Sequence, residues 1–163
     1  MKEIIITCCL ALTSLCCYSQ TQTGGIHPGE IWPDDKGVHV NAHGGGMLYA
    51  EGTYYWFGEF KSDTTSVALD GVTCYSSRDL VHWKNEGIAM PVMPVGSYSD
   101  IESGCILERP KVVYNKKTNK YVMWFHLELK GKGYAAARVG VAVSDKVTGP
   151  YRFVHSYRPC AGF

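Results

Sequence analysis

The chain has 163 residues and a mass of 18.0 kDa, enough for one domain, and 45% hydrophobic against 19% charged residues excludes wholesale disorder. Its 16 Lys and Arg residues nearly balance 15 Asp and Glu residues, and no basic cluster is long enough to follow a phosphate backbone, so nucleic acid is not expected as a partner. The 18 glycines and 11 tyrosines favour strands and turns over long helices.

Residues 1–19 are predicted to be a secretory signal peptide. An uncharged run over residues 4–15 follows the first three residues and is too short to span a bilayer, so no membrane span is expected. Cleavage after Ser19 would leave Gln20 at the new N-terminus and make the protein secreted or periplasmic. The alternative is an outer-surface lipoprotein in which Cys16 or Cys17 carries the lipid.

The part of the chain after the signal peptide gives no indication of a metal, a cofactor or a disulfide scaffold. It keeps three cysteines, Cys74, Cys105 and Cys160, which cannot all pair, and it has no Cys-x-x-Cys or His-Glu-x-x-His motif. We expect ordinary core cysteines. Residues 34–37 (DDKG) resemble a calcium loop only superficially, because their turn-forming composition is a sufficient explanation.

An internal repeat with an offset of about 67 residues organises residues 20–163. A turn and an aromatic strand at residues 52–58 correspond to residues 119–125, and an apolar strand at 72–77 corresponds to 139–144. Each half also opens with a strand and closes with an aromatic segment, at residues 46–50 and 81–84 in the first half and at 111–115 and 150–153 in the second. Four short strands in a meander are the unit of a β-propeller blade, although two hairpins in a sandwich would give a similar repeat.

A propeller ring takes about four to eight blades, and the 163 residues have room for only two blades of this length. An isolated pair would leave an apolar face open to water. The expectation is therefore an N-terminal portion of a longer protein.

Four strings carry a resemblance to a known family, and they are residues 41–46 (NAHGGG), 54–59 (YYWFGE), 77–83 (SRDLVHW) and 108–115 (ERPKVVYN). Together they resemble glycoside hydrolase family 43, and more narrowly its branch of exo-β-1,3-galactanase-like enzymes. The resemblance extends from about Ile26 to Pro159. It implies an all-β, five-bladed β-propeller, of which the chain holds about the first two four-stranded blades.

The resemblance also implies a chemistry, the inverting hydrolysis of glycosidic bonds in a polysaccharide such as β-galactan or arabinogalactan side chains. That reaction uses a general acid and a base whose carboxyl groups lie roughly 6.5–9.5 Å apart. In the family the general acid belongs to a later blade, so it is expected beyond residue 163. Residues 41–43 offer no carboxylate at the place of the base, a feature of the galactanase-like branch that leaves the group that activates water unknown.

Three residues are the candidates for holding the sugar: His43, Glu59 and Glu108. The three glycines after His43 would let backbone approach a sugar ring, and the two glutamates could accept hydrogen bonds from its hydroxyl groups. Each has an ordinary alternative. His43 could cap a glycine-rich turn, and Glu59 could be an exposed strand end.

For Glu108 the alternative is an ion pair with Arg109 or Lys111, and Glu102 is a competing carboxylate in the loop just before it. Glu108 is preferred because it belongs to the family string. Stacking on a sugar ring is expected from at least one of four aromatic residues, although each of them is more simply a core residue between blades; they are Tyr55, Trp56, Trp83 and Trp124.

Three classes of function remain open on these observations. The first is a polysaccharide hydrolase, and the second is a non-catalytic secreted propeller fragment that binds carbohydrate. A third is a propeller used only for protein contacts, which would not need polar residues at positions 43 and 108.

Overall fold

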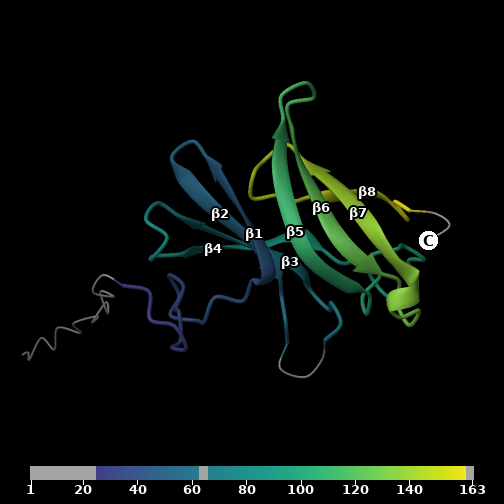
Figure 1. Cartoon of the computed structure of the whole chain (residues 1–163), viewed down its shortest axis with the longest axis horizontal. Helices are drawn as coiled ribbons and strands as arrows, with labels where there is room; N and C mark the ends of the chain where they lie inside the picture. The colour runs from purple at the N-terminus through teal and green to yellow at the C-terminus, as the bar shows by residue number, and fades with distance from the viewer. Residues whose placement is uncertain (1–24, 63–65, 161–163) are drawn as a thin grey trace, which may run out of the picture.

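The computed structural model describes residues 25–62 and 66–160, so the predicted signal peptide lies outside the described residues. Two antiparallel four-stranded sheets make up the fold (Figure 1), and each is a meander in which strands that follow one another in sequence are neighbours. The first sheet contains β1 (His43–Ala50), β2 (Thr53–Glu59), β3 (Gly71–Ser77) and β4 (Lys84–Pro91). The second contains β5 (Ile106–Asn115), β6 (Lys120–Glu128), β7 (Ala137–Ser144) and β8 (Arg152–Tyr157), and a single 3₁₀ turn, η1 (Tyr134–Ala136), precedes β7.

The two sheets repeat each other in register, which confirms the predicted pair of β-propeller blades. Tyr54 of β2 pairs with Ser77 of β3, and 67 positions later Tyr121 of β6 pairs with Ser144 of β7. The repeat includes irregularities, because the third and fourth strands of both sheets shift register at the same place, after Cys74 in β3 and 67 positions later in β7.

The last strand of each sheet lies further along the chain than predicted. β4 begins at Lys84 and β8 at Arg152, so the aromatic segments 81–84 and 150–153 mostly precede the strands. The physical reason in the first sheet is a side-chain turn. Asp79 Oδ1 accepts hydrogen bonds from the main-chain N–H groups of Val81 and His82 at 2.9 and 2.8 Å, which competes with strand pairing.

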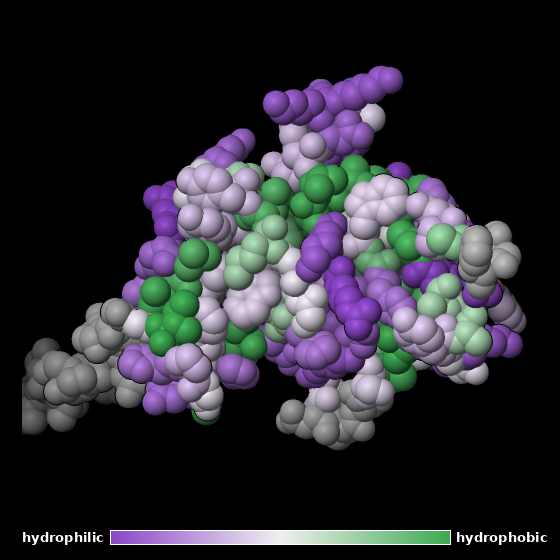
Figure 2. Space-filling model, viewed as in Figure 1, coloured by the Kyte–Doolittle hydropathy of each residue, from purple (hydrophilic) through white to green (hydrophobic). Residues whose placement is uncertain are grey.

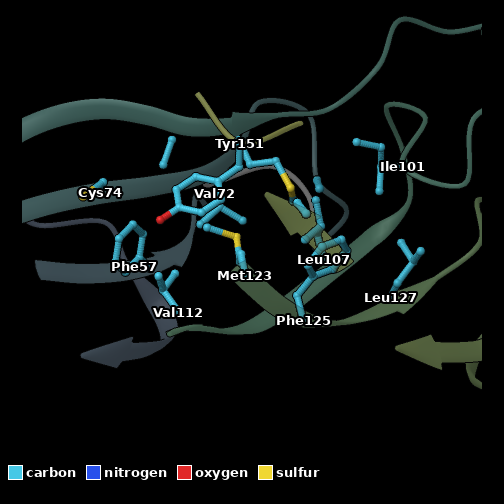
Figure 3. Close-up of a cluster of buried hydrophobic side chains, with 14 of the residues drawn as sticks. Phe57, Val72, Cys74, Ile101, Leu107, Val112, Met123, Phe125, Leu127 and Tyr151 are labelled. Atoms are coloured by element: carbon cyan, nitrogen blue, oxygen red, sulfur yellow. The ribbon is translucent and has the colours of Figure 1, made fainter. Parts of the chain in front are cut away.

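The main hydrophobic core lies between the two sheets (Figure 3), where β2, β3 and β4 face β5 and β6. Strand alternation explains which residues enter it, since Met123, Phe125 and Leu127 of β6 are buried there. Burying a side chain of this size contributes about 1.5–3 kcal/mol. Tyr151, just before β8, closes the core against Phe57 with ring centres 5.9 Å apart.

A second, aromatic cluster covers the opposite face of the first sheet. Trp32, from the segment before β1, lies with its ring centre 5.6 Å from that of Trp56 and 6.2 Å from that of Trp83. Trp56 and Trp83 are therefore core residues, but they pack on the N-terminal segment and not between blades, where we expected them. Tyr55 does pack between the sheets.

The outer face of the second sheet carries apolar side chains at the surface. Apolar residues, coloured green, are also visible at the surface on the face of the molecule shown in Figure 2. Trp124, with 40% of its surface exposed, occupies the position in β6 that Phe57 has in β2, 67 residues earlier. Phe57 is fully buried against the other sheet. Both faces of each sheet are thus built to pack, which is typical of propeller blades.

Cys74 and Cys105 are buried core residues as predicted, whereas Cys160 is exposed. The turn interpretation of residues 34–37 is also confirmed, since Asp34 Oδ1 accepts the N–H groups of Lys36 and Val38 at 2.9 and 3.0 Å. In the described part of the chain, no helix is long and apolar enough to cross a membrane. No group of three or more His, Cys, Asp or Glu residues suited to a metal ion occurs among residues 25–62 and 66–160.

Candidate functional site

The structure brings the three predicted site residues together at one end of β1 and β5, the first strands of the two sheets. His43 is the first residue of β1, Glu59 is the last residue of β2, and Glu108 lies near the start of β5. β1 and β5 lie side by side (Figure 1), and antiparallel pairing places the end of β2 beside the start of β1. His43 Nδ1 is 3.8 Å from Glu59 Oε2.

Lys61, which the sequence did not single out, connects the two carboxylates. Its ammonium group lies 2.9 Å from Glu59 Oε2 and 3.7 Å from Glu108 Oε1, and it donates a hydrogen bond of 2.9 Å to the carbonyl oxygen of Ser66. Only 24% of the Lys61 side chain is exposed. The cluster therefore holds one ammonium group between two carboxylates from different sheets.

Asn41 fixes the main chain of Lys61 on both sides. Its Nδ2 donates to the Lys61 carbonyl oxygen at 2.6 Å, and its Oδ1 accepts from the Lys61 N–H at 2.8 Å. Asn41 is itself anchored to β3, because its N–H donates to the Tyr75 hydroxyl and its carbonyl oxygen accepts from the Thr73 hydroxyl. Lys61 is thus tied to the first sheet although it follows β2.

Glu59 is fully buried, which contradicts the alternative of an exposed strand end. No residue in the described part of the chain gives either of its carboxylate oxygens a well-directed hydrogen bond, and the 2.9 Å approach of the Lys61 ammonium is an ion-pair contact. Burial raises the pKa of Glu59, and nearby Glu108 acts in the same direction, while Lys61 and His43 oppose them.

Glu108 is half-buried and makes only long contacts. Besides Lys61, its one ion-pair partner among the described residues is Arg109, whose Nη2 lies 4.0 Å from Oε2. Lys111 is turned away and donates to the carbonyl oxygen of Gly45 at 2.7 Å. The predicted alternative of an ion pair with Arg109 or Lys111 therefore describes at most a weak contact with Arg109.

The glycines after His43 have a packing role that differs from the one we predicted. A Cβ atom on Gly45 would lie 2.3 Å from Nε1 of Trp56, and one on Gly46 would lie 2.5 Å from the carbonyl oxygen of Pro110. These two glycines allow β1 to approach β2 and β5 closely. Only Gly44, with a φ of 58° and no atom within 3.7 Å of a built Cβ, leaves space beside the site.

Glu102, the competing carboxylate, has structural partners. Its Oε1 lies 3.0 Å from the ammonium group of Lys130 and accepts the Gly96 N–H at 3.1 Å. The lysine lowers the pKa of Glu102. The preference for Glu108 over Glu102 thus agrees with the positions of both side chains.

The two sheets carry the same irregularity at the site. β1 pairs His43 with Glu59 and then shifts register by one residue before Gly46, and β5 pairs Glu108 with His126 and shifts in the same way before Lys111. In the first sheet the histidine is on β1 and the glutamate on β2, whereas at the matching positions of the second sheet the glutamate is on β5 and the histidine on β6. His126 also lies 3.1 Å from Glu128 Oε1 and stacks on Tyr134 with ring centres 5.8 Å apart.

Two of these residues had signals in the sequence that we did not use. Lys61 follows Glu59 by two positions, the spacing that keeps side chains on the same side of an extended chain. His126 is 67 positions after Glu59 and so follows from the repeat itself.

A cavity of about 990 Å³ lies at the other end of the first sheet, where Thr53, Ser77 and Lys84 line it. A smaller cavity of about 270 Å³ occupies the matching place in the second sheet, beside Lys120 and Ser144. Because both blades have this hollow at the same position of the repeat, we attribute it to the blade architecture and place the candidate site at the cluster of Glu59 and Glu108.

Comparison with known proteins gives matches among solved structures, while neither a protein-family model nor a curated protein matches the chain. A family-43 β-1,3-galactosidase solved with galactodeoxynojirimycin is 58% identical, with a TM-score of 0.75 over 78% of this chain and 37% of its own. An exo-β-1,3-galactanase from Phanerochaete chrysosporium, solved with β-1,3-galactotriose, is 40% identical with a TM-score of 0.74, over 80% of this chain and 29% of its own.

An exo-β-1,3-galactanase from Clostridium thermocellum is likewise 40% identical, with a TM-score of 0.68 over 80% of this chain and 27% of its own. The chain thus spans between 27% and 37% of the length of these three proteins.

Proposed function

Because the chain belongs to glycoside hydrolase family 43, in the branch of exo-β-1,3-galactanase-like enzymes, we propose that the protein hydrolyses β-1,3-linked galactan. The substrate class follows the names of the related proteins, which are β-1,3-galactosidases and exo-β-1,3-galactanases. The proposal also includes arabinogalactan, the other plant-type polysaccharide that the family resemblance implies.

Within that function, we assign His43, Glu59 and Glu108 to the binding of a galactosyl residue. The observation that carries this assignment is the cluster itself, in which the accessible side chains of His43 and Glu108 lie beside the buried Glu59 carboxylate and the ammonium group of Lys61. Glu108, with 24% of its side chain exposed, can accept a hydrogen bond from a sugar hydroxyl group directly. A sugar lacking a matching hydroxyl would leave this acceptor unpaired, which is costly and gives selectivity.

The proposed reaction proceeds with inversion, as the family resemblance implies. It needs a general acid to protonate the leaving oxygen and a group to activate water on the opposite face of the ring. The proposal assigns neither of these two groups to a residue described here and gives the binding of the sugar to the cluster of His43, Glu59 and Glu108. Secretion, or export to the periplasm, is part of the proposal and rests on residues 1–19.

The test is hydrolysis of β-1,3-galactobiose by the full-length protein, followed by proton NMR from the first minutes. The reducing-end unit contributes both anomers, so the readout is the anomer in excess of that mixture. An early excess of α-galactose would support both the activity and inversion, whereas an early excess of β-galactose would refute inversion. β-1,4-Galactobiose is the matched control for linkage. Galactose binding without hydrolysis would favour the non-catalytic carbohydrate-binding alternative, and the absence of both would overturn the proposal.

A further inference from the structure

We propose that Lys61 is a positioning residue of the galactose site, whose ammonium group holds Glu59 and Glu108 side by side as ionised acceptors. The inference deepens the proposed function and depends on it. It assigns to Lys61 a task distinct from contact with the sugar, namely the control of the charge of the two carboxylates.

The geometry around the ammonium group supports this role. Lys61 Nζ lies within 4 Å of both carboxylates, which come from different sheets, and it also donates to the Ser66 carbonyl oxygen at 2.9 Å. These contacts engage an ammonium group that has three donors. Two glutamates approaching each other without a cation between them would repel, and one of them would be driven to take up a proton.

The main chain of Lys61 is held as firmly as its side chain. Asn41 bonds both the N–H and the carbonyl oxygen of Lys61, and Asn41 is bonded in turn to Tyr75 and Thr73 of β3. A lysine that served only as a mobile counter-ion would not need a main chain fixed at two points. The ammonium position is therefore set by the first sheet.

The groups that surround Glu59 come from every neighbouring element. They are Lys61 after β2, His43 of β1, Glu108 of β5 and the Cys105 thiol in the loop before β5. Burial and Glu108 raise the pKa of Glu59, and Lys61 is the largest of the groups that lower it. Because an opposite charge within about 4–6 Å lowers a carboxyl pKa by about one to three units, loss of the Lys61 charge favours protonation of the cluster.

The experiment measures galactose affinity against pH, by isothermal titration calorimetry, in the full-length protein and in Lys61→Met and Lys61→Arg. In the wild type, galactose affinity is expected to fall as the pH drops and the carboxylates of the cluster take up a proton. The midpoint is the pH at which half of this loss of affinity has occurred. Lys61→Met is expected to move this midpoint upward by about one unit or more, with affinity near that of the wild type well above it. Lys61→Arg keeps the charge and is expected to restore the midpoint.

Lys84→Met is the matched control, since Lys84 also pairs with a carboxylate, Glu86, at 3.0 Å, but at the other end of the first sheet. Its midpoint should equal that of the wild type. Repeating the series in a His43→Asn background removes the imidazole as a second titrating cation. A loss of affinity in Lys61→Met that is equal at every pH, or an unmoved midpoint, would overturn the positioning role.

Asn41→Ala decides the question if Lys61→Met does not fold, because it keeps the ammonium group and removes the two hydrogen bonds that fix the main chain of Lys61. It should move the midpoint in the same direction by a smaller amount, and an unmoved midpoint would refute the inference. If the wild type binds no galactose at any pH, the proposed function fails. If it binds but no variant shifts the midpoint, only the role of Lys61 fails.

Discussion

Replacing Glu108 with Gln separates a sugar-binding carboxylate from a structural one. Glu108 is 24% exposed, and its two ion-pair contacts are long, 3.7 Å to Lys61 and 4.0 Å to Arg109. Contacts of this kind contribute about 1 kcal/mol or less to stability. Hydrogen bonds from a ligand to a charged group are worth about 1.5–3 kcal/mol, so Glu108→Gln should weaken galactose binding by about 10- to 150-fold and leave the melting temperature nearly unchanged.

Glu102→Gln is the matched control for this prediction. Glu102 has the same side chain and lies in the loop before β5, but its oxygen is occupied by Lys130 and by the Gly96 N–H. Its replacement should lower stability slightly without changing galactose affinity. Calorimetric titration and thermal unfolding of both variants check the pair. Unchanged affinity in a folded Glu108→Gln protein, or an equal loss in Glu102→Gln, would refute the reasoning.

Three further predictions concern packing, pH and thiol reactivity. Gly46→Ala should destabilise the protein by about 1–3 kcal/mol in thermal unfolding, because the new Cβ would lie 2.5 Å from a carbonyl oxygen of β5; an unchanged melting temperature would contradict the close approach. Burial raises the pKa of Glu59 above its ordinary 4.5, so its contribution to stability is complete below that value and is lost as pH rises through the higher folded-state pKa. The free energy of unfolding can be measured in urea titrations between about pH 4 and pH 8. As pH increases, it should fall less in Glu59→Gln than in the wild type. A difference in free energy between the two proteins that does not change with pH would contradict this prediction. Finally, Cys160 is exposed, while burial raises the pKa of Cys74 and brings that of Cys105 to about 12. Peptide mapping after thiol labelling should therefore find Cys160 modified in the folded protein, and Cys74 and Cys105 modified only after denaturation. Labelling of Cys105 in the folded protein would contradict its burial.

The blade repeat was predictable because it depends on alternation and turns that the sequence carries locally. The offset of 67 residues reproduces the pairing of Tyr54 with Ser77 and of Tyr121 with Ser144. The start of β4 was not predictable in the same way. It depends on the Asp79 side chain, which bonds two main-chain N–H groups and delays the strand.

The candidate site was predictable in part. His43, Glu59 and Glu108 stood out through the family strings, and the structure places them close together. Lys61 was missed because its importance comes from Glu108, which is 47 positions away in the sequence (108 − 61). The packing role of Gly45 and Gly46 was not predictable, since their neighbours come from other strands and only the tertiary structure reveals them.

The one-residue register shift near the start of β1 and β5 divides each of these strands into two alternation frames. From Gly46 and Lys111 onward, one frame decides which side chains pack against the next strand, whereas His43 and Glu108 belong to the other. Deleting one residue within either shift would merge the frames and turn the functional side chain to the opposite face, while the downstream pairing stayed intact. A blade can therefore gain or lose its polar residue at the site through a change of a single position, without rebuilding the core that supports it.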